Sequence, residues 1–162
     1  MATTHHFQVL LSSGVDQARS ASKPRQAQRD HTLEVAGKPP LIGSAAPSFH
    51  GDNTKWNPEE LFAAALSQCH FLSLVYVADR DGWEIESVEL SAEAALEIGP
   101  EGGQITQVVL RPRTTVGASV DPEVVIAAHH EAEKLCFIAR SVSCEVVVEP
   151  EVIGGSTRDT QV

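Results

Sequence analysis

Three cysteines, Cys69, Cys136 and Cys144, are the residues of this 162-residue chain that could carry nucleophilic or redox chemistry. Free cysteine is among the most buried residue types, so each one alone is expected to be a core thiol. Cys69 and Cys136 differ from Cys144 because each falls on one of the two long helices that the sequence predicts. Two helices that pack on one sheet run side by side, and a thiol pair across their seam could close as a disulfide if the Cα atoms come within about 7 Å.

An odd cysteine count at wide spacing is not typical of a secreted disulfide framework. In a reducing cytosol, a disulfide between two helices is usually transient and catalytic. Cys144 alternates with valines on a predicted strand, and we expect it to lie in the core. The sequence therefore singles out Cys69 and Cys136 as the candidate redox pair.

A reactive thiol needs a cation or a helix N-terminus that stabilises its thiolate. Arg29, just before the second predicted strand, is the best-placed cation, with Lys23 and Arg25 as alternatives, and each could simply be a solvated surface side chain. Glu59 could orient an arginine through a bidentate contact, or could serve only the helix dipole. Ten residues of regular helix, about 15 Å, separate Glu59 from Cys69, so a site that uses both needs a second chain or an irregular helix start.

Metal binding is the rival use of these side chains. Cys69 and His70 are adjacent and point about 100° apart on a helix, while His129 and Cys136 lie two turns apart. Neither spacing is typical of a zinc site, and the chain contains no CxxC or HExxH motif. We therefore expect neither a metal nor another cofactor.

Capping residues predict where the two helices that carry the cysteines begin and end. The first begins after Asn57 with Pro58 and two acidic residues, runs to about Asp79 and stops at Gly82. Its predicted apolar stripe consists of Phe62, Ala65, Leu66, Cys69, Leu72, Ser73 and Tyr76. The second begins at 121–123 with the same cap, proline and acid pattern and reaches Cys136.

Alternating apolar residues predict five strands around these helices, at 7–11, 31–35, 85–98, 105–116 and 142–148. The order β-β-α-β-β-α-β predicts an α+β fold with antiparallel sheets and two helices packed against them. We expect one domain over residues 1–153, followed by a polar, disordered tail at 154–162.

Twelve basic and 22 acidic residues give a formal net charge of −10, which disfavours nucleic acid and anionic membranes as partners. No run approaches the roughly 18 uninterrupted apolar residues of a spanning helix, and the first residues lack the basic region of a secretory signal. We expect a cytoplasmic protein.

Three segments of the chain resemble the OsmC/Ohr family of thiol peroxidases, and more closely its OsmC-like branch. They are GSAAPSFHGD at 43–52, NPEELFAAALSQCH at 57–70 and CFIARSV at 136–142. The resemblance runs from about residue 5 to residue 150. It departs from the organic-hydroperoxide-resistance branch at Phe137 and Ile138, where that branch commonly has a proline, and in the loop before Arg29, which lacks its glycine-rich pattern.

This resemblance implies an intertwined homodimer in which strands of both chains surround the central helices and two sites lie at the interface. By position, Cys69 matches the peroxidatic cysteine, Cys136 the resolving cysteine, Glu59 the motif glutamate and Arg29 the thiolate-activating arginine. A second chain that supplies Arg29 and Glu59 would also remove the 15 Å conflict.

The activity that these residues and the resemblance imply is reduction of organic hydroperoxides in oxidative or osmotic stress defence. Cys69 would become a sulfenic acid, condense with Cys136 and be regenerated by a dithiol reductant of the lipoyl type. Three nearby aromatic residues favour organic peroxides, namely Phe62, Phe71 and Phe137. The alternatives are a non-catalytic dimeric binding or stress-sensing domain with the same fold, and an inert fold with buried thiols.

Overall fold

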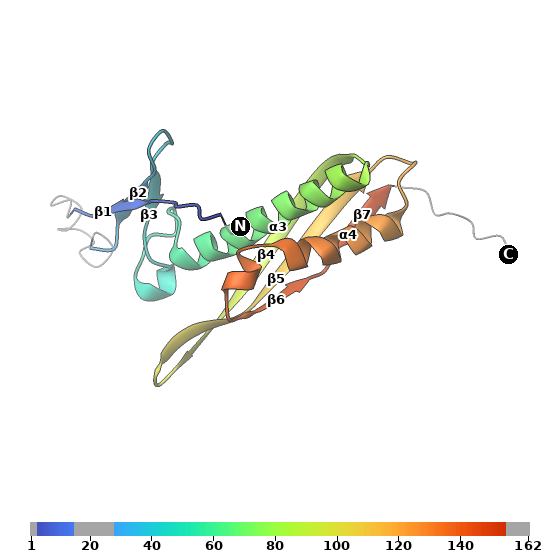
Figure 1. Cartoon of the computed structure of the whole chain (residues 1–162). Helices are drawn as coiled ribbons and strands as arrows, with labels where there is room; N and C mark the ends of the chain where they lie inside the picture. Colours follow the sequence, from blue (N-terminus) through green and yellow to red (C-terminus); the bar gives the residue numbers. More distant parts are fainter. Residues whose placement is uncertain (1–2, 15–27, 155–162) are drawn as a thin grey trace. The chain divides into compact units, whose positions relative to one another are not determined.

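The computed structural model describes residues 3–14 and 28–154 and divides the chain into two compact units, residues 1–61 and 62–162 (Figure 1). Lys23, Arg25 and most of the polar stretch before Arg29 lie outside the described residues, as does the predicted tail from residue 155 onward. The expected boundary of a single domain at residue 153 stays a prediction.

The first unit contains a three-stranded antiparallel sheet in the order β1 (Leu10–Ser12), β2 (His31–Glu34) and β3 (Leu41–Gly43). The first strand begins three residues later than predicted, and β3 was not predicted. It directly follows Pro39 and Pro40, which have no N–H to donate to a ladder, so the strand begins only after them.

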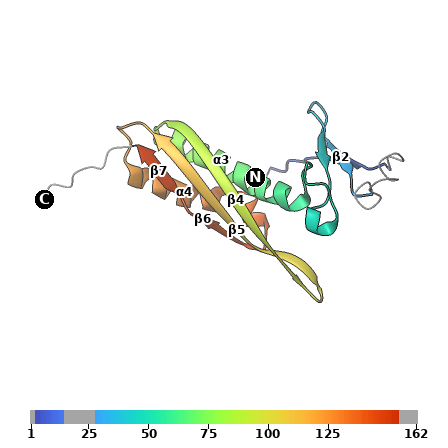
Figure 2. The same ribbon diagram turned by 180° about the vertical axis from the view of Figure 1, so that it is seen from behind.

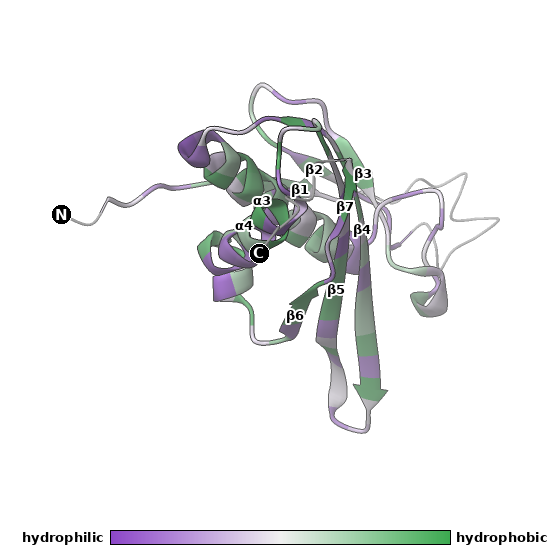
Figure 3. Ribbon diagram, turned by 90° about the vertical axis from the view of Figure 1, so that its right-hand side faces the viewer, coloured by the Kyte–Doolittle hydropathy of each residue, from purple (hydrophilic) through white to green (hydrophobic). Residues whose placement is uncertain are grey.

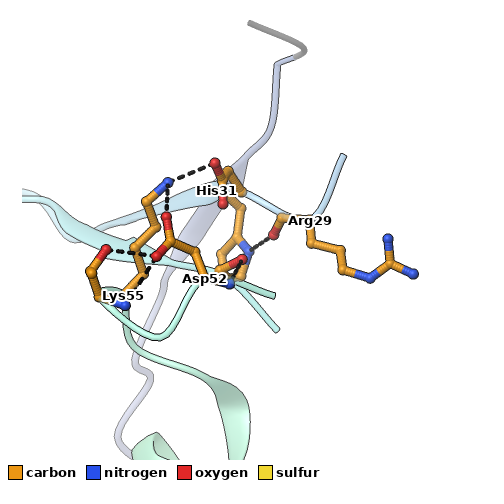
Figure 4. Close-up of polar contacts among 7 residues, drawn as sticks. Arg29, His31, Asp52 and Lys55 are labelled. Carbon is orange, nitrogen blue, oxygen red and sulfur yellow. Dashed lines mark hydrogen bonds and ion pairs between the residues drawn. The ribbon is translucent and has the colours of Figure 1, made fainter. Parts of the chain in front are cut away.

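The GSAAPSFHGD segment folds into a tight loop around the short helix η1 (Pro47–Phe49). A Cβ at Gly51 would lie 1.5 Å from the Ala45 carbonyl oxygen, so only glycine fits there. Packing against Ala45 thus explains the motif glycine at position 51. Beyond it, Lys55 Nζ lies 2.6 Å from an Asp30 carboxylate oxygen and 3.7 Å from one of Asp52 (Figure 4).

The helix α3 (Pro58–Asp81) has the ends that the sequence predicts, with the C-terminus two residues later. The Asn57 side chain accepts the Glu60 N–H at 2.8 Å, and Glu60 Oε2 accepts the Asn57 N–H at 3.2 Å, which is a reciprocal capping box. Gly82 has φ +75°, and the Trp83 N–H donates to the Ala78 carbonyl, so the chain leaves the helix through a left-handed residue.

The second unit contains a mixed sheet in which β5 (Gly102–Val116) is central. β4 (Ile85–Gly99) pairs with it antiparallel, as predicted. β6 (Glu145–Val148) and β7 (Glu151–Gly154) both pair with it parallel, so the expectation of purely antiparallel pairing is wrong there. Because α4 (Pro122–Leu135) carries the chain back across the sheet, the strands after it run in the direction of β5.

Two prolines explain why the last edge is divided into β6 and β7. The β6 ladder ends at Leu110 of β5 and the β7 ladder begins at Arg113, so the interruption lies beside Pro112. Pro150 lies in the two-residue gap between β6 and β7. Neither proline has an N–H to give to a ladder.

Both helices lie on one side of this sheet, as Figures 2 and 3 show. Alternate β5 side chains are buried: Val108, Leu110, Pro112, Thr114 and Val116. On the exposed face, Arg111 pairs with Glu93 and Glu149, and Arg113 pairs with Glu89 and Glu151. The sheet therefore has one face for the helices and one that its own ion pairs cover.

The buried face of α3 differs from the predicted stripe. Its buried residues are Leu66, His70, Leu74, Val77 and Ala78. Leu72 and Tyr76, which belong to the predicted apolar stripe, are 58% and 59% exposed. By length and composition α3 could cross a bilayer, but the core helix of a water-soluble protein passes the same test.

Candidate thiol site

The structure brings Cys69 and Cys136 together. Cys69 lies in the middle of α3 and is half-buried, whereas Cys136 caps the C-terminus of α4, where its N–H donates to the Ala132 carbonyl at 2.9 Å. Both are free thiols, and the two side chains are hydrogen-bonded to each other. The predicted pairing of one thiol from each helix is therefore present.

A tight turn after α4 supplies further donors to both sulfurs. The Ile138 N–H donates to Cys69 Sγ at 3.5 Å, and the Ala139 N–H donates to Cys136 Sγ at 3.3 Å. The turn is held by the Arg140 N–H, which donates to the Cys136 carbonyl at 3.1 Å, and leads into the helix η2 (Ala139–Ser141). At Cys136, burial raises the pKa of the thiol by more than the Ala139 N–H lowers it.

The two thiols have different environments. Cys136 is 1% exposed, and burial raises its pKa to about 11, with a further increase from the hydrogen bond to Cys69. Cys136 is therefore a protonated thiol at neutral pH, and Cys69 is the more accessible of the two.

Cys69 lines a hollow of about 600 Å³ with mostly apolar walls. Its other lining residues are Ala65, Gln68, Leu72, Ser73, Tyr76, Leu135, Phe137 and Ile138. Of the three aromatic residues proposed to favour an organic substrate, only Phe137 lies here. Phe62 packs against the core that contains Leu66, and Phe71 lines a different hollow beside Trp83.

Arg29 and Glu59 belong to the first unit. Arg29 lies in the turn before β2, its carbonyl accepts a hydrogen bond from His31 Nδ1 at 3.0 Å, and its side chain extends away from Lys55 and Asp52 (Figure 4). Glu59 lies in the first turn of α3, where its Oε2 is buried without a hydrogen-bond partner among the described residues. Their roles in a site stay predictions.

Cys144 is half-buried and packs against the core that contains Leu66 and Val108. It precedes β6 instead of lying within a strand, because the strand begins at Glu145 and not at Val142. In the described part of the chain, no group of three or more His, Cys, Asp and Glu side chains could hold a metal ion.

A buried polar network beside Cys69 was missed by the sequence analysis. His70 Nε2 lies 3.0 Å from His129 Nδ1, and His129 Nε2 lies 2.9 Å from Thr114 Oγ1. The signal was present, because His70 is four residues from both Leu66 and Leu74 and so shares their face of the helix. Burial lowers the pKa of each histidine to about 4, and the charges of His70 and His130 add to this for His129.

The fold and the paired thiols define an α+β protein with a candidate redox-active cysteine pair. A model of the family described as OsmC-like protein matches residues 51–151, and the chain belongs to this family. The resemblance found in the sequence is thereby confirmed.

Relatives with solved structures cover nearly the whole chain. An OsmC-like protein of unknown function from Vibrio cholerae is 29% identical, with a TM-score of 0.80 over 91% of this chain and 99% of its own. The organic hydroperoxide resistance protein OhrB of Bacillus subtilis is 21% identical, with a TM-score of 0.61 over 90% of this chain and 96% of its own. The latter likeness shows the shared fold.

A curated relative is the uncharacterized protein YmaD of Bacillus subtilis, which is 24% identical over 98 residues. That match spans 59% of this chain and 65% of the relative's length.

We expect the buried histidines to make the fold sensitive to acid. Each histidine takes up a proton near pH 6.5 in the unfolded chain but only near pH 4 in the folded protein. Its contribution to the stability of the fold is therefore complete above pH 6.5 and is lost as the pH falls towards 4. In urea unfolding, the free energy of unfolding should rise with pH across this window. The double change His70→Leu, His129→Leu should reduce that slope by up to about two protons. His6→Gln, at an exposed histidine, is the matched control; equal slopes in the wild type and the double variant would contradict the assignment.

We also expect alkylation to separate the two thiols. With a substoichiometric amount of iodoacetamide at neutral pH, peptide mapping should find the label on Cys69 and very little on Cys136, because Cys136 is buried and protonated. Preferential labelling of Cys136 in the native protein would show that the asymmetry is wrong.

Proposed function

We propose that this chain is a cysteine-based hydroperoxide reductase in which Cys69 attacks the peroxide and Cys136 resolves the product. The observation that carries the proposal is the unequal thiol pair, with a half-buried Cys69 open to an apolar hollow and a buried, protonated Cys136 hydrogen-bonded to it. Membership of the OsmC-like family supports the assignment.

The first step is attack of the Cys69 thiolate on the distal oxygen of the hydroperoxide. The O–O bond breaks, the alkoxide takes a proton and leaves as the alcohol, and Cys69 becomes a sulfenic acid. The Ile138 N–H donates to Cys69 Sγ, and the Cys136 thiol is hydrogen-bonded to it, so both groups lie beside the reacting sulfur.

The second step is attack of Cys136 on the sulfenic sulfur. An S–S bond forms, the hydroxyl leaves, and the Cys136 proton completes a water molecule, so the two electrons that the peroxide gains come from the two thiols. A dithiol of the lipoyl type then reduces the disulfide by exchange. Thiols alone supply this chemistry, without a metal, flavin or haem.

The walls of the hollow favour a hydroperoxide with an organic group. Leu72, Leu135 and Ile138 offer apolar surface beside Cys69, and transfer of an alkyl or aryl group from water to such walls is favourable. Hydrogen peroxide has no such group. Related proteins named for organic hydroperoxide resistance point in the same direction, and we assign the chain to cytoplasmic oxidative or osmotic stress defence.

We further propose that a second copy of this chain covers the exposed side of α3 and completes the site. Leu72, Tyr76 and Phe137 are all more than half exposed, and together they border the Cys69 hollow. An exposed apolar surface of this kind is typical of an interface. The second copy would also supply the Arg29 guanidinium, oriented by Glu59, to stabilise the Cys69 thiolate.

Replacement of each cysteine in turn tests the chemistry. With an alkyl hydroperoxide and a dithiol donor, Cys69→Ser should abolish peroxide consumption. Cys136→Ser should stop at the sulfenic acid, which dimedone traps on Cys69 in about stoichiometric amount. Cys144→Ser is the matched control and should turn over at the wild-type rate. Equal peroxide consumption by the wild type and Cys69→Ser would instead favour the non-catalytic binding or sensing domain.

Mixed dimers test whether Glu59 and Cys69 of one site come from different chains. Glu59→Ala and Cys69→Ser should each be nearly inactive alone. After exchange of subunits, about half of the dimers are mixed and each holds one intact site, so activity should recover to about a quarter of the wild type. A mixture that stays as inactive as its components, with mixed dimers verified by native mass spectrometry, would place both residues in one chain.

A further inference from the structure

A buried chain of three polar side chains joins the two helices that carry the thiols to the sheet beneath them. His70 of α3 contacts His129 of α4 at 3.0 Å, and His129 contacts Thr114 of β5 at 2.9 Å. The three residues are at most 1% exposed, and the two rings stack with centroids 5.3 Å apart and an interplanar angle of 9°. The proposed peroxide chemistry uses none of them.

The hydrogen-bond pattern fixes where the protons lie. If His129 Nδ1 donated to His70, the remaining proton of His70 would lie on Nδ1, which is buried and has no partner among the described residues. An orphaned buried N–H is rarer than an orphaned acceptor. His70 Nε2 therefore donates to His129 Nδ1, and His129 Nε2 donates to Thr114 Oγ1, with both rings neutral.

The position of this network links it to the thiols. His70 follows Cys69 directly on α3, and His129 precedes Cys136 by seven residues, or two turns, on the same face of α4. Apart from the two thiols themselves, the fully buried contacts between these helices involve Leu74, Val77, Ala128 and Ala132, which are apolar and carry no directional bond. Apolar contacts with two alanines tolerate sliding, whereas a hydrogen bond of defined length and angle does not.

A second polar link between the helices is exposed. Arg80 of α3 donates to Glu131 of α4 through both Nη1 and Nη2, and both side chains are 41% exposed. An exposed ion pair contributes little, because water screens it and long side chains lose freedom in forming it. The buried histidines are therefore the link that can set the register of the helices.

We propose that His70, His129 and Thr114 form a positioning clamp that fixes the register of α3 against α4 and so holds Cys69 and Cys136 within reach of disulfide closure. The clamp's contribution to peroxide turnover rests on the proposed function. Its effect on the spacing of the two thiols is independent of that function, because any oxidant that closes the disulfide reports on the spacing. The histidines are positioning residues, since both nitrogens of His129 and the Nε2 of His70 are occupied within the network.

The test is the effective concentration of the two thiols for each other, measured from the dithiol–disulfide equilibrium in a glutathione buffer. One oxidised glutathione and the protein dithiol give the protein disulfide and two reduced glutathiones. His70→Leu removes the donor while it keeps apolar bulk, and should lower the effective concentration at least about tenfold. His70→Gln, whose side-chain amide can donate to His129 Nδ1, should restore most of it. Glu131→Gln, the matched control at the exposed link, should leave it unchanged.

Thr114→Val keeps the shape of its side chain and removes only the terminal acceptor, so it gives a readout even if His70→Leu does not fold. We expect a smaller loss there, about threefold. A folded His70→Leu with the wild-type effective concentration, or a Thr114→Val with no loss, would overturn the clamp. A wild type in which the clamp is verified but peroxide is not consumed would overturn the proposed function alone.

Discussion

The division of α3 into a buried face and an open face is the constraint on which the thiol site depends. Leu66, His70 and Leu74 follow one another at four-residue spacing and lie against the rest of the second unit. Cys69 precedes His70 by one position, so its side chain is rotated by about 100° towards the open side. Packing of its helix neighbours therefore holds the backbone of Cys69 in place, while its half-buried side chain lines the hollow.

The same packing makes the two cysteines unequal. Cys136 caps the C-terminus of α4, where its sulfur is buried and keeps its proton. The turn that follows directs the Ile138 N–H to Cys69. One chain reversal thus supplies the second thiol, a donor to the first and an apolar wall at Phe137. An accessible thiol with a second thiol beside it is the arrangement in which a sulfenic acid can condense to a disulfide.

Local signals in the sequence predicted the helix ends and the cysteine pairing. Asn57, Gly82 and Asp121 act through neighbours in the chain, and the structure shows each in its predicted capping role. The buried face of α3 could not be predicted in this way, because apolar residues occur all around the helix and periodicity cannot choose between two apolar stripes. The parallel pairing of β6 and β7 depends on the path of the chain through α4, which strand patterns do not encode.

The histidine network was missed for a related reason. The spacing of His70 to Leu66 and Leu74 indicates its burial but not its partner, because His129 lies 59 residues further along the chain. Thr114, the partner of His129, lies 15 residues before it on a strand. The roles proposed for Arg29 and Glu59 require a second chain, and no pattern within one chain reports such a contact. The sequence was most informative where one helix turn decides the outcome and least informative where distant segments meet.

The central claim is that Cys69 and Cys136 act as one redox pair, and disulfide mapping after peroxide treatment tests it most directly. The reduced protein receives one equivalent of an alkyl hydroperoxide, is quenched with acid and is mapped by mass spectrometry. The account predicts one product, in which Cys69 and Cys136 are joined within one chain and Cys144 remains a free thiol. Oxidised protein in which Cys69 carries no bond to Cys136 would contradict it.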